Sequence, residues 1–455
     1  MMTLDEVARA VGAVAADAFG RIDGVATDTR TMTPGCLFVA LRGARLDGHG
    51  FLRDAASQGA VAALTDRPRE PGWPPCIVVP DTRHALGRLA AYWRRKMPAK
   101  VLAVTGSNGK TSVKELTARI LATGRRGIAT QGNLNNDIGL PLTLLRLRPE
   151  HDYAVVEIGM NRPGEIAALG ALAAPDAAVV TNAGSAHLEG LGTVEAVARE
   201  KGSLYSTLAR QGTAVVNVDD HYASYWKGLA PGPVSTYGLD QGADVSARFT
   251  LRSDGTDLSI RAPGWSEPLA ARLALLGRHN VANALAATAL ALTFGAAREA
   301  IAAGLAQAAP VAGRLESAPG LAGSRLIDDS YNANPDSARA ALDVLAGLPG
   351  ERWFILGDMA ELGEAAALMH RTFGATAAAS RVEHFWTLGP LAREAAAAFG
   401  AGGRHYEDHE TLLRDLKAVL HKGAVVLVKG SRSMRMERVA SALRAGGGPN
   451  VPAHP

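Results

Sequence analysis

The residues best suited to chemistry lie where a short apolar segment, VLAVTG (101–106), runs into a glycine-rich turn and then a helical pattern. Glycines let backbone N–H groups approach phosphate oxygens, and the helix N-terminus adds partial positive charge. A following Lys-Thr pair can supply an ammonium for the β- and γ-phosphates and a hydroxyl ligand for Mg²⁺. The residues of this predicted phosphate loop are Gly106, Ser107, Asn108, Gly109, Lys110, Thr111 and Ser112. The sequence therefore predicts a nucleoside triphosphate site, and a glycine-rich turn that binds nothing is the weaker alternative.

The spacing of this loop departs from the usual pattern. Gly106 and Gly109 have only two residues between them, whereas the usual loop has four residues between its first glycine and the Gly-Lys pair. A phosphate loop by itself leaves kinases, GTPases, motors and ligases open, so other segments must decide among these classes.

Two further candidates follow neighbouring strands. Glu157 lies in the apolar segment at 154–159, and His187 follows the next such segment, at 177–182. Parallel strands place their carboxyl ends at one edge, where such sheets bind ligands, so both side chains should lie near the loop. Mg²⁺ prefers oxygen ligands, and a glutamate is costly to bury without a partner. The alternatives are a solvated carboxylate for Glu157 and a surface histidine for His187.

The elements that must position these residues alternate between strands and helices. Apolar segments of strand length at 101–106, 154–159, 177–182 and 213–218 are separated by helical patterns. Such strands predict a parallel sheet covered on both faces. Residues 234–273 instead alternate polar and apolar residues between turns, which predicts an antiparallel insertion with one solvated face.

Similar alternation on both sides of this region predicts two more α/β domains. We expect a small substrate domain at 1–97, the central ATP-binding phosphate-loop domain at 98–312, and a Rossmann-like lid domain at 313–455. Strand patterns of the last domain lie at 325–331, 352–358, 383–389 and 424–430. A length of 455 residues agrees with three domains of about 150 residues each. The predicted fold class is therefore α/β with three domains.

Composition narrows the functional classes. The chain is 47% hydrophobic and 20% charged, which is typical of a folded globular protein. Its net charge is only +4 and it has no run of five or six basic residues, which argues against nucleic-acid binding. We find neither a signal-peptide pattern nor an apolar stretch of about 20 residues, so we expect a cytoplasmic enzyme without membrane insertion.

Taken together, these segments resemble the ATP-dependent Mur ligases of bacterial peptidoglycan synthesis over nearly the whole chain. The segment TGSNGKTSVKE (105–115) is similar to the shortened phosphate loop of that family, which accounts for its spacing. Similar blocks follow in the family's order: EIGMNRPGEI (157–166), NAGSAHLEGLG (182–192), AREKGSLY (198–205), LLGRHNVANALAA (275–287), GRLE (313–316) and VKGSR (428–432). The resemblance implies an ATP-dependent, ADP-forming ligase that forms a C–N bond.

The resemblance also implies roles for single residues, with Lys110, Glu157, His187 and Lys201 as the catalytic set. Thr111 and Glu157 would bind a Mg²⁺ ion shared with ATP, and His187 would help hold a second ion. Lys201 matches a lysine that is carbamoylated in the family, which would turn a repelled ammonium into a carboxylate-like metal ligand. Further ATP contacts would come from Asn280, Asn283, Arg314, Asp328, Tyr331 and Asn332. The UDP-sugar contacts would come from Asp28, Thr29, Arg30, Asn133, Asn135 and Asn136.

Each of these roles has a simpler alternative. Asn280 and Asn283 could cap a helix N-terminus. Asp328 could be a solvated carboxylate at a strand end. Lys201 looks by itself like an ordinary helix lysine.

Within the family, the likeness is greatest to the ligases that add D-alanyl-D-alanine. TDTRTMTPGCLFVALRGARLDGHGF (27–51) is similar to their uridine-nucleotide domain. QGNLNNDIGLPLTLL (131–145) and DDSYNANPDSARAAL (328–342) are similar to their versions of variable blocks. This implies a monomer whose partners are small molecules: UDP-N-acetylmuramoyl-tripeptide, D-alanyl-D-alanine and ATP. They would react through an acyl phosphate to give the UDP-linked pentapeptide.

Two alternatives remain open: a ligase that uses another amino acceptor, and a protein that is not an enzyme of this kind. The ligase that adds the third residue usually carries an Asp-Asn-Pro-Arg box, which we do not find, and folylpolyglutamate synthases lack the uridine-binding domain. A phosphate-loop switch that uses nucleotide only to change shape is the alternative from outside the enzymes, and no switch-like segment favours it.

Overall fold

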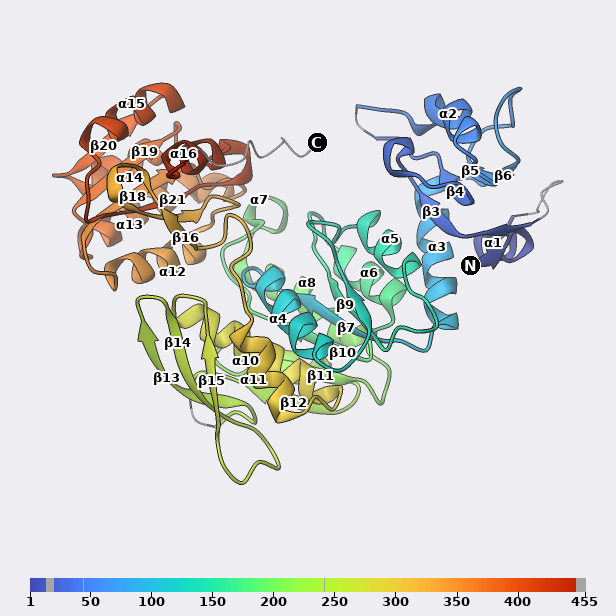
Figure 1. Cartoon of the computed structure of the whole chain (residues 1–455), viewed down its shortest axis with the longest axis horizontal. Helices are drawn as coiled ribbons and strands as arrows, with labels where there is room; N and C mark the ends of the chain where they lie inside the picture. The colour runs from blue at the N-terminus through green and yellow to red at the C-terminus, as the bar shows by residue number, and fades with distance from the viewer. Residues whose placement is uncertain (14–19, 44, 241, 447–455) are drawn as a thin grey trace.

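The computed structural model describes residues 1–13, 20–43, 45–240 and 242–446. Three lobes follow one another along the chain (Figure 1): an N-terminal lobe in blue, a central lobe from cyan to yellow, and a C-terminal lobe in orange and red. Each lobe is built on parallel strands flanked by helices, so the predicted α/β fold class is confirmed. Within the described ranges, no helix has the length and apolar character needed to cross a bilayer.

The N-terminal lobe is built on a parallel four-stranded sheet. Its strands pair in the order β3 (Gly24–Ala26), β4 (Cys36–Val39), β5 (Ala62–Thr65) and β6 (Cys76–Val78). The short antiparallel pair β1 (Met2–Thr3) and β2 (Arg21–Ile22) and the helices α1 (Leu4–Val11), α2 (Leu52–Ser57) and α3 (Thr82–Lys96) complete the lobe. Strands β4 and β5 are buried along their whole length, as expected for strands covered on both faces.

The central lobe contains a fully parallel six-stranded sheet. In spatial order, its strands are β12 (Val234–Tyr237), β11 (Thr213–Asn217), β10 (Ala177–Val180), β7 (Lys100–Thr105), β9 (Tyr153–Glu157) and β8 (Gly127–Ala129). Its helices are α4 (Lys110–Ala122), α5 (Gly139–Leu145), α6 (Glu165–Ala173), α7 (Leu188–Leu191), α8 (Val194–Gly202), α9 (Ala223–Leu229), α10 (Arg278–Thr293) and α11 (Arg298–Ala306). Successive strand residues face opposite sides. Val101 and Ala103 therefore join one core with α3, α5 and α6, while Leu102 and Val104 join another with α4, α10 and α11.

The prediction of an antiparallel insertion at 234–273 is wrong at its first strand. β12 pairs in parallel with β11 and forms the edge of the main sheet. As an edge strand it is only partly covered, with Val234 38% exposed, so its pattern is similar to that of a half-solvated antiparallel strand. The antiparallel sheet comprises β13 (Ser246–Arg252), β14 (Gly255–Arg261) and β15 (Leu269–Leu273).

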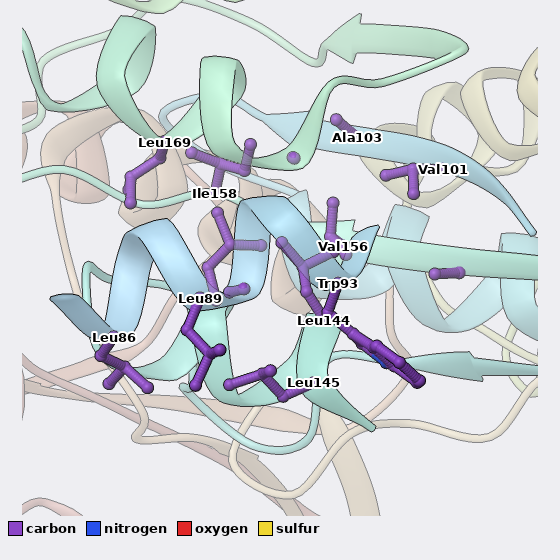
Figure 2. Packing of buried hydrophobic residues seen from close by; sticks show 14 of the residues in the cluster. Leu86, Leu89, Trp93, Val101, Ala103, Leu144, Leu145, Val156, Ile158 and Leu169 are labelled. Atoms are coloured by element: carbon purple, nitrogen blue, oxygen red, sulfur yellow. The ribbon is translucent and has the colours of Figure 1, made fainter. Parts of the chain in front are cut away.

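Helix α3 joins the first two lobes. Leu86, Leu89 and Trp93 pack with residues of β7, α5 and α6 in one hydrophobic cluster (Figure 2). The Trp93 indole donates a hydrogen bond to the Leu147 carbonyl at 3.0 Å. The buried Arg94 guanidinium pairs with Asp176 at 2.9 Å. These contacts anchor the N-terminal lobe on the outer face of the central sheet.

The C-terminal lobe has a second six-stranded sheet. Its order is β16 (Glu316–Pro319), β17 (Arg325–Asp329), β21 (Ala424–Lys429), β18 (Glu351–Gly357), β19 (His384–Leu388) and β20 (Gly403–Tyr406). Only β16 is antiparallel to its neighbour. The helices are α12 (Pro335–Ala346), α13 (Ala366–Ala378), α14 (Ala392–Phe399), α15 (His409–Val419) and α16 (Glu437–Leu443). The four strands expected from sequence are all present, and the short β16 and β20 were not expected.

Candidate active site

The phosphate loop runs from the end of β7 into the first turn of α4. Gly106 (φ +149°) and Gly109 (φ +82°) have backbone conformations that residues with a side chain rarely adopt. A Cβ on Gly106 would lie 1.8 Å from Thr181 Oγ1, and a Cβ on Gly109 would lie 2.3 Å from Asn283 Oδ1. The loop therefore requires glycine at both positions, and its path is set by the end of β10 and by α10.

Hydrogen bonds from two lobes hold this loop. The Asn108 amide donates to Asn182 Oδ1 at 2.9 Å, and the Gly184 amide donates to Ser107 Oγ at 2.9 Å. From the C-terminal lobe, Asn334 at the N-cap of α12 donates through Nδ2 to Asn108 Oδ1 at 2.9 Å. The C-terminal lobe thus contacts the phosphate loop directly.

We expect Gly106→Ala to weaken ATP binding at least about tenfold, or about 1.4 kcal/mol, because the loop must move to relieve the contact with Thr181. The matched control is Gly124→Ala, since a Cβ there meets nothing within 4 Å. Calorimetric ATP binding and thermal denaturation of both variants check this. Wild-type affinity in a folded Gly106→Ala protein would show that the loop geometry does not govern binding.

A cleft of about 660 Å³ lies between the central and C-terminal lobes. The predicted site residues that line it are Ser107, Asn108, Gly109, Lys110, Ser112, Asn135, Asn136, Glu157, His187, Asn280, Asn283, Arg314, Tyr331 and Asn332. The structure thus brings most of the predicted residues to one place, while their individual roles remain predictions.

Positive groups from both lobes gather at the loop. Lys110 Nζ donates to the Gly106 and Ser107 carbonyls at 2.7 and 3.4 Å. Burial lowers the pKa of Lys110, the nearby Glu157 charge acts in the opposite direction, and the Arg314 charge lowers that pKa further. The Arg314 guanidinium lies over the Tyr331 ring at 4.3 Å, which fixes its position. Lys110 and Arg314 are two cations that line the same cleft, and such a pair favours a ligand with several negative charges.

Glu157 has two features of a metal ligand: it is buried, and one of its carboxylate oxygens has no hydrogen-bond partner among the described residues. Its side chain is 3% exposed; Oε1 accepts a hydrogen bond from Asn135 Nδ2 at 2.8 Å, while the buried Oε2 has no hydrogen-bond partner. The buried Thr111 is the first residue after the loop lysine. No group of three or more His, Cys, Asp and Glu side chains is arranged to bind a metal within the part of the chain that the structure describes. Glu157 and Thr111 are oxygen donors, the ligand type that Mg²⁺ prefers, so both could contribute to a magnesium site.

Lys201 is a buried lysine of α8. It is 1% exposed, does not line the cleft, and has no carboxylate within 4 Å among the described residues. Burial, followed by the charge of Lys110, lowers the pKa of its amine well below the usual value. The alternative of an ordinary solvated lysine is therefore excluded, and burial disfavours the charged form of the amine.

His187 precedes α7 in a left-handed backbone conformation (φ +59°). Its Nδ1 lies 2.7 Å from the carboxylate of Glu361 in the C-terminal lobe. The imidazole is 22% exposed and lines the cleft, so it is held by a specific partner rather than free on the surface.

Asn280 and Asn283 do not cap α10, whose N-cap is Gly277. Asn280 Nδ2 donates to the Leu276 carbonyl and Asn283 Nδ2 donates to Asn280 Oδ1, both at 2.9 Å. The pair reaches the phosphate loop through the contact between Asn283 and Gly109 described above. The capping alternative is therefore not supported.

The two acids at the end of β17 face different surroundings. Asp329 lines the cleft, pairs with Lys429 Nζ at 2.6 Å and is buried. The predicted residue Asp328 is equally buried but accepts hydrogen bonds from Ser330 and lies 3.8 Å from Arg444, and burial raises its pKa. Consecutive strand residues point to opposite faces, so only Asp329 is on the cleft side. Neither carboxylate is solvated.

The remaining predicted substrate residues lie outside the cleft. Asn133 is exposed. Asp28 caps a short 3₁₀ turn, η1 (Thr29–Thr31), and forms an exposed ion pair with Arg30 at 2.6 Å. Thr29, in the same turn, is partly exposed. The structure does not bring this N-terminal turn together with the phosphate loop.

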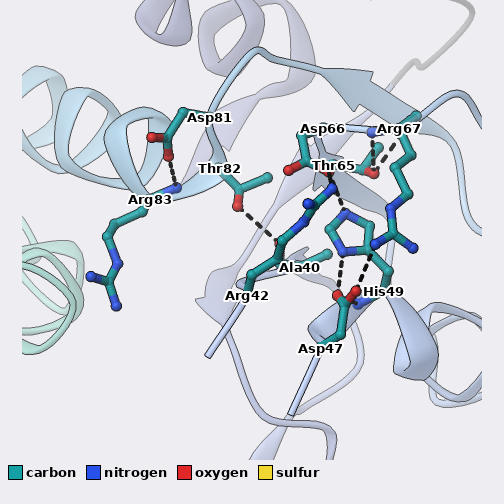
Figure 3. Close-up of polar contacts among 10 residues, drawn as sticks. All are labelled: Ala40, Arg42, Asp47, His49, Thr65, Asp66, Arg67, Asp81, Thr82 and Arg83. Atoms are coloured by element: carbon teal, nitrogen blue, oxygen red, sulfur yellow. Dashed lines mark hydrogen bonds and ion pairs between the residues drawn. The ribbon is translucent and has the colours of Figure 1, made fainter. Parts of the chain in front are cut away.

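A second polar cluster lies at the carboxyl edge of the N-terminal sheet (Figure 3). His49 is buried between two carboxylates, with Nδ1 2.5 Å from Asp47 and Nε2 3.0 Å from Asp66. Arg67 and Arg42 pair with these acids at 2.6 and 3.0 Å. Hydrogen bonds from the backbone and ring of His49 lower the pKa of Asp47 to about 2. The cluster ties the loop after β4 to the loop after β5.

Several residues of the cleft were missed by the sequence reasoning. Asn182 follows β10 directly, so the rule that placed Glu157 and His187 at the sheet edge could have found it. His279 lines the cleft, and burial lowers its pKa to about 4, so its ring is neutral at neutral pH. Glu361 has no local signal, because its contact with His187 exists only when two lobes meet.

Comparisons with known proteins cover nearly the whole chain. Three family models match: "Mur ligase family, catalytic domain" at 21–94, "Mur ligase middle domain" at 104–291, and "Mur ligase, glutamate ligase domain" at 313–432. The UDP-N-acetylmuramoyl-tripeptide–D-alanyl-D-alanine ligase of Escherichia coli K12 is 45% identical and covers 94% of each chain.

Two solved structures are also similar. A crystal structure of MurF from Acinetobacter baumannii has a TM-score of 0.89 at 34% identity and covers 96% of this chain and 97% of its own. MurF ligase from Thermotoga maritima in complex with ADP has a TM-score of 0.81 at 28% identity. The match covers 93% of this chain and 97% of that structure's chain.

Proposed function

The chain belongs to the Mur ligase family, and we propose that it joins D-alanyl-D-alanine to UDP-N-acetylmuramoyl-tripeptide in peptidoglycan synthesis. It is an ATP-dependent ligase. The observation that carries the choice of substrates is the 45% identity to a ligase of that name over 94% of the chain, N-terminal lobe included. We further propose that the domains are 1–97 for the UDP-sugar, 98–312 for ATP and 313–455 as the lid. The enzyme would work in the cytoplasm as a monomer on these small molecules.

In the first step, the terminal carboxylate of the tripeptide attacks the γ-phosphorus of ATP, which gives an acyl phosphate and ADP. In this step the negatively charged carboxylate approaches the negatively charged triphosphate. The main task of the protein is therefore to offset their repulsion. We assign this task to Lys110 and Arg314, and their position in the lining of the cleft supports the assignment. The glycine turn and the N-terminus of α4 present backbone amides to the phosphates.

In the second step, the amine of D-alanyl-D-alanine attacks the activated carbonyl, and phosphate leaves through a tetrahedral intermediate. The dipeptide must react as a neutral amine, so its ammonium proton has to be removed first. The cleft lies between lobes, and the C-terminal lobe contacts the phosphate loop at Asn108. Excluding water protects the acyl phosphate from hydrolysis.

Thr111, Glu157 and His187 would hold Mg²⁺, which would neutralise phosphate charge when bound. The orphaned Glu157 oxygen and the His187 ring at the cleft support this assignment. We propose that Lys201 is carbamoylated, since its burial lowers the pKa of the amine and so shifts it toward the neutral form that reacts with CO₂.

The test is release of orthophosphate from ATP with the UDP-tripeptide and different amines. We expect D-alanyl-D-alanine to stimulate release at least about 100-fold more than single amino acids or glutamate, since a site built for the amide and the more distant carboxylate of a dipeptide leaves its polar groups unpaired when a shorter acceptor binds. Equal stimulation by a single amino acid would favour a ligase with another acceptor. Turnover that ignores both the UDP-tripeptide and the amine would favour a nucleotide-driven switch.

A further inference from the structure

Glu361, at the boundary between the central and C-terminal lobes, has an unusual backbone conformation. It lies in the loop between β18 and the short 3₁₀ turn η5 (Gly363–Ala365) and has φ +62°. A non-glycine residue in this region is strained and persists only where its surroundings hold it there. The contacts of Glu361 are therefore expected to hold its backbone in this conformation.

Both polar ends of Glu361 reach across to α7. Its carbonyl accepts a hydrogen bond from the Glu189 amide at 3.0 Å, and its Oε2 lies 2.7 Å from His187 Nδ1. His187 itself has φ +59°. Two residues with left-handed backbones, one from each lobe, therefore meet through their side chains.

The contact determines which ring nitrogen of His187 is available. A carboxylate accepts hydrogen bonds, so Nδ1 must carry the proton that it donates to Glu361. In the neutral ring the lone pair is then on Nε2, the nitrogen left for a ligand in the cleft. A carboxylate behind a histidine both fixes its tautomer and holds its ring, and losing such a partner typically lowers metal affinity or activity about 10–100-fold.

We propose that Glu361 is a positioning residue that orients His187 when the C-terminal lobe docks on α7. The cation site at His187 is then complete only in the closed arrangement, which delays phosphoryl transfer until the cleft is shut. This inference rests on the proposed function for its phosphoryl-transfer step. The competing explanation is that Glu361 only balances the charge of Lys110, which also acts on this carboxylate.

Three variants separate these explanations. Glu361→Gly keeps the left-handed backbone and removes the carboxylate. Glu361→Gln keeps the length and an acceptor oxygen but removes the charge. The control is Glu364→Gln, which neutralises an exposed acid in the adjacent turn η5.

The measurements are kcat, KM for ATP, and Mn²⁺ binding by electron paramagnetic resonance with a non-hydrolysable ATP analogue. For Glu361→Gly we expect kcat and the affinity of the weaker Mn²⁺ ion to fall about 10–100-fold, with KM for ATP changed less than about twofold. Glu361→Gln should recover a large part of both losses, and Glu364→Gln should match wild type.

Two results would overturn the proposal: Mn²⁺ affinity unchanged in Glu361→Gly, or Glu361→Gln as impaired as Glu361→Gly, which would assign the role to charge. Mn²⁺ binding needs neither peptide substrate, so this readout is independent of the acceptor. A failure of the proposed function would appear in the amine assay instead.

Discussion

Lys110→Met is expected to lower kcat/KM for ATP by at least about 1,000-fold, equivalent to about 4 kcal/mol of transition-state stabilisation. The ammonium is the mobile cation of the loop, and it lies in a half-buried site where a charge is screened less than in water. Methionine keeps most of the apolar stem, so the loss reports the charge rather than packing. Steady-state phosphate release with all three substrates is the measurement.

Lys227→Met is the control, since Lys227 is an exposed lysine of α9 and its change should leave kcat/KM within about twofold. Lys110→Arg is informative as well, because the guanidinium keeps the charge but is larger and planar. Near-wild-type turnover by Lys110→Met would contradict the assignment of Lys110 to the transferred phosphate. If the Lys110→Met protein does not denature cooperatively, it is not folded, and the Lys110→Arg variant is used for the test instead.

Much of the site was predictable because it is local or lies at a sheet edge. The phosphate loop is one continuous segment between a strand and a helix, so its residues follow directly from the chain. Glu157 and His187 could be placed near it because Glu157 ends one parallel strand of the sheet and His187 follows another. The structure places both on the cleft, as this argument expected.

Other features depend on register or on contacts between lobes. Asp328 and Asp329 are adjacent acids, and only the strand register shows that Asp329 faces Lys429. The pattern of β12 could not reveal a parallel edge strand, because half-covered strands look alike in either orientation. Glu361 was invisible for a further reason: its backbone conformation and its partner are set by the docking of the C-terminal lobe.

The charges of the cleft explain why it needs two lobes. The central lobe supplies Lys110 and the acid Glu157, while the C-terminal lobe supplies Arg314 beside Tyr331 and the buried Lys429–Asp329 pair. A triphosphate bound to the central lobe alone would contact only the charged groups of that lobe. Cations from both lobes thus line the same cleft, and electrostatic stabilisation of developing negative charge is greatest where such groups are held in place and water is excluded.

Lys201→Ala is expected to lower kcat at least about 100-fold, with partial recovery on adding a short carboxylate such as acetate or formate. Lys201 is 1% exposed, and burial lowers the pKa of its amine well below the usual value, which shifts the group toward the neutral form that can form a carbamate with CO₂. The alanine variant leaves a space the size of the lost side chain, and a small acid can return an oxygen ligand to it. Wild-type enzyme depleted of CO₂ and bicarbonate should lose activity in the same direction.

The matched control is Lys114→Ala, because Lys114 is also 1% exposed but its amine is held by Glu115 at 2.6 Å and by the Thr130 carbonyl at 2.7 Å. Loss of that lysine should lower stability, and added carboxylate should restore nothing, since no anionic ligand is missing there. Labelled bicarbonate provides the direct readout: a ¹³C carbamate signal should appear in wild type and be absent from Lys201→Ala. Full activity of Lys201→Ala without any added acid would refute the carbamate while leaving the ligase assignment in place, because the phosphate loop and the acceptor assay do not depend on it.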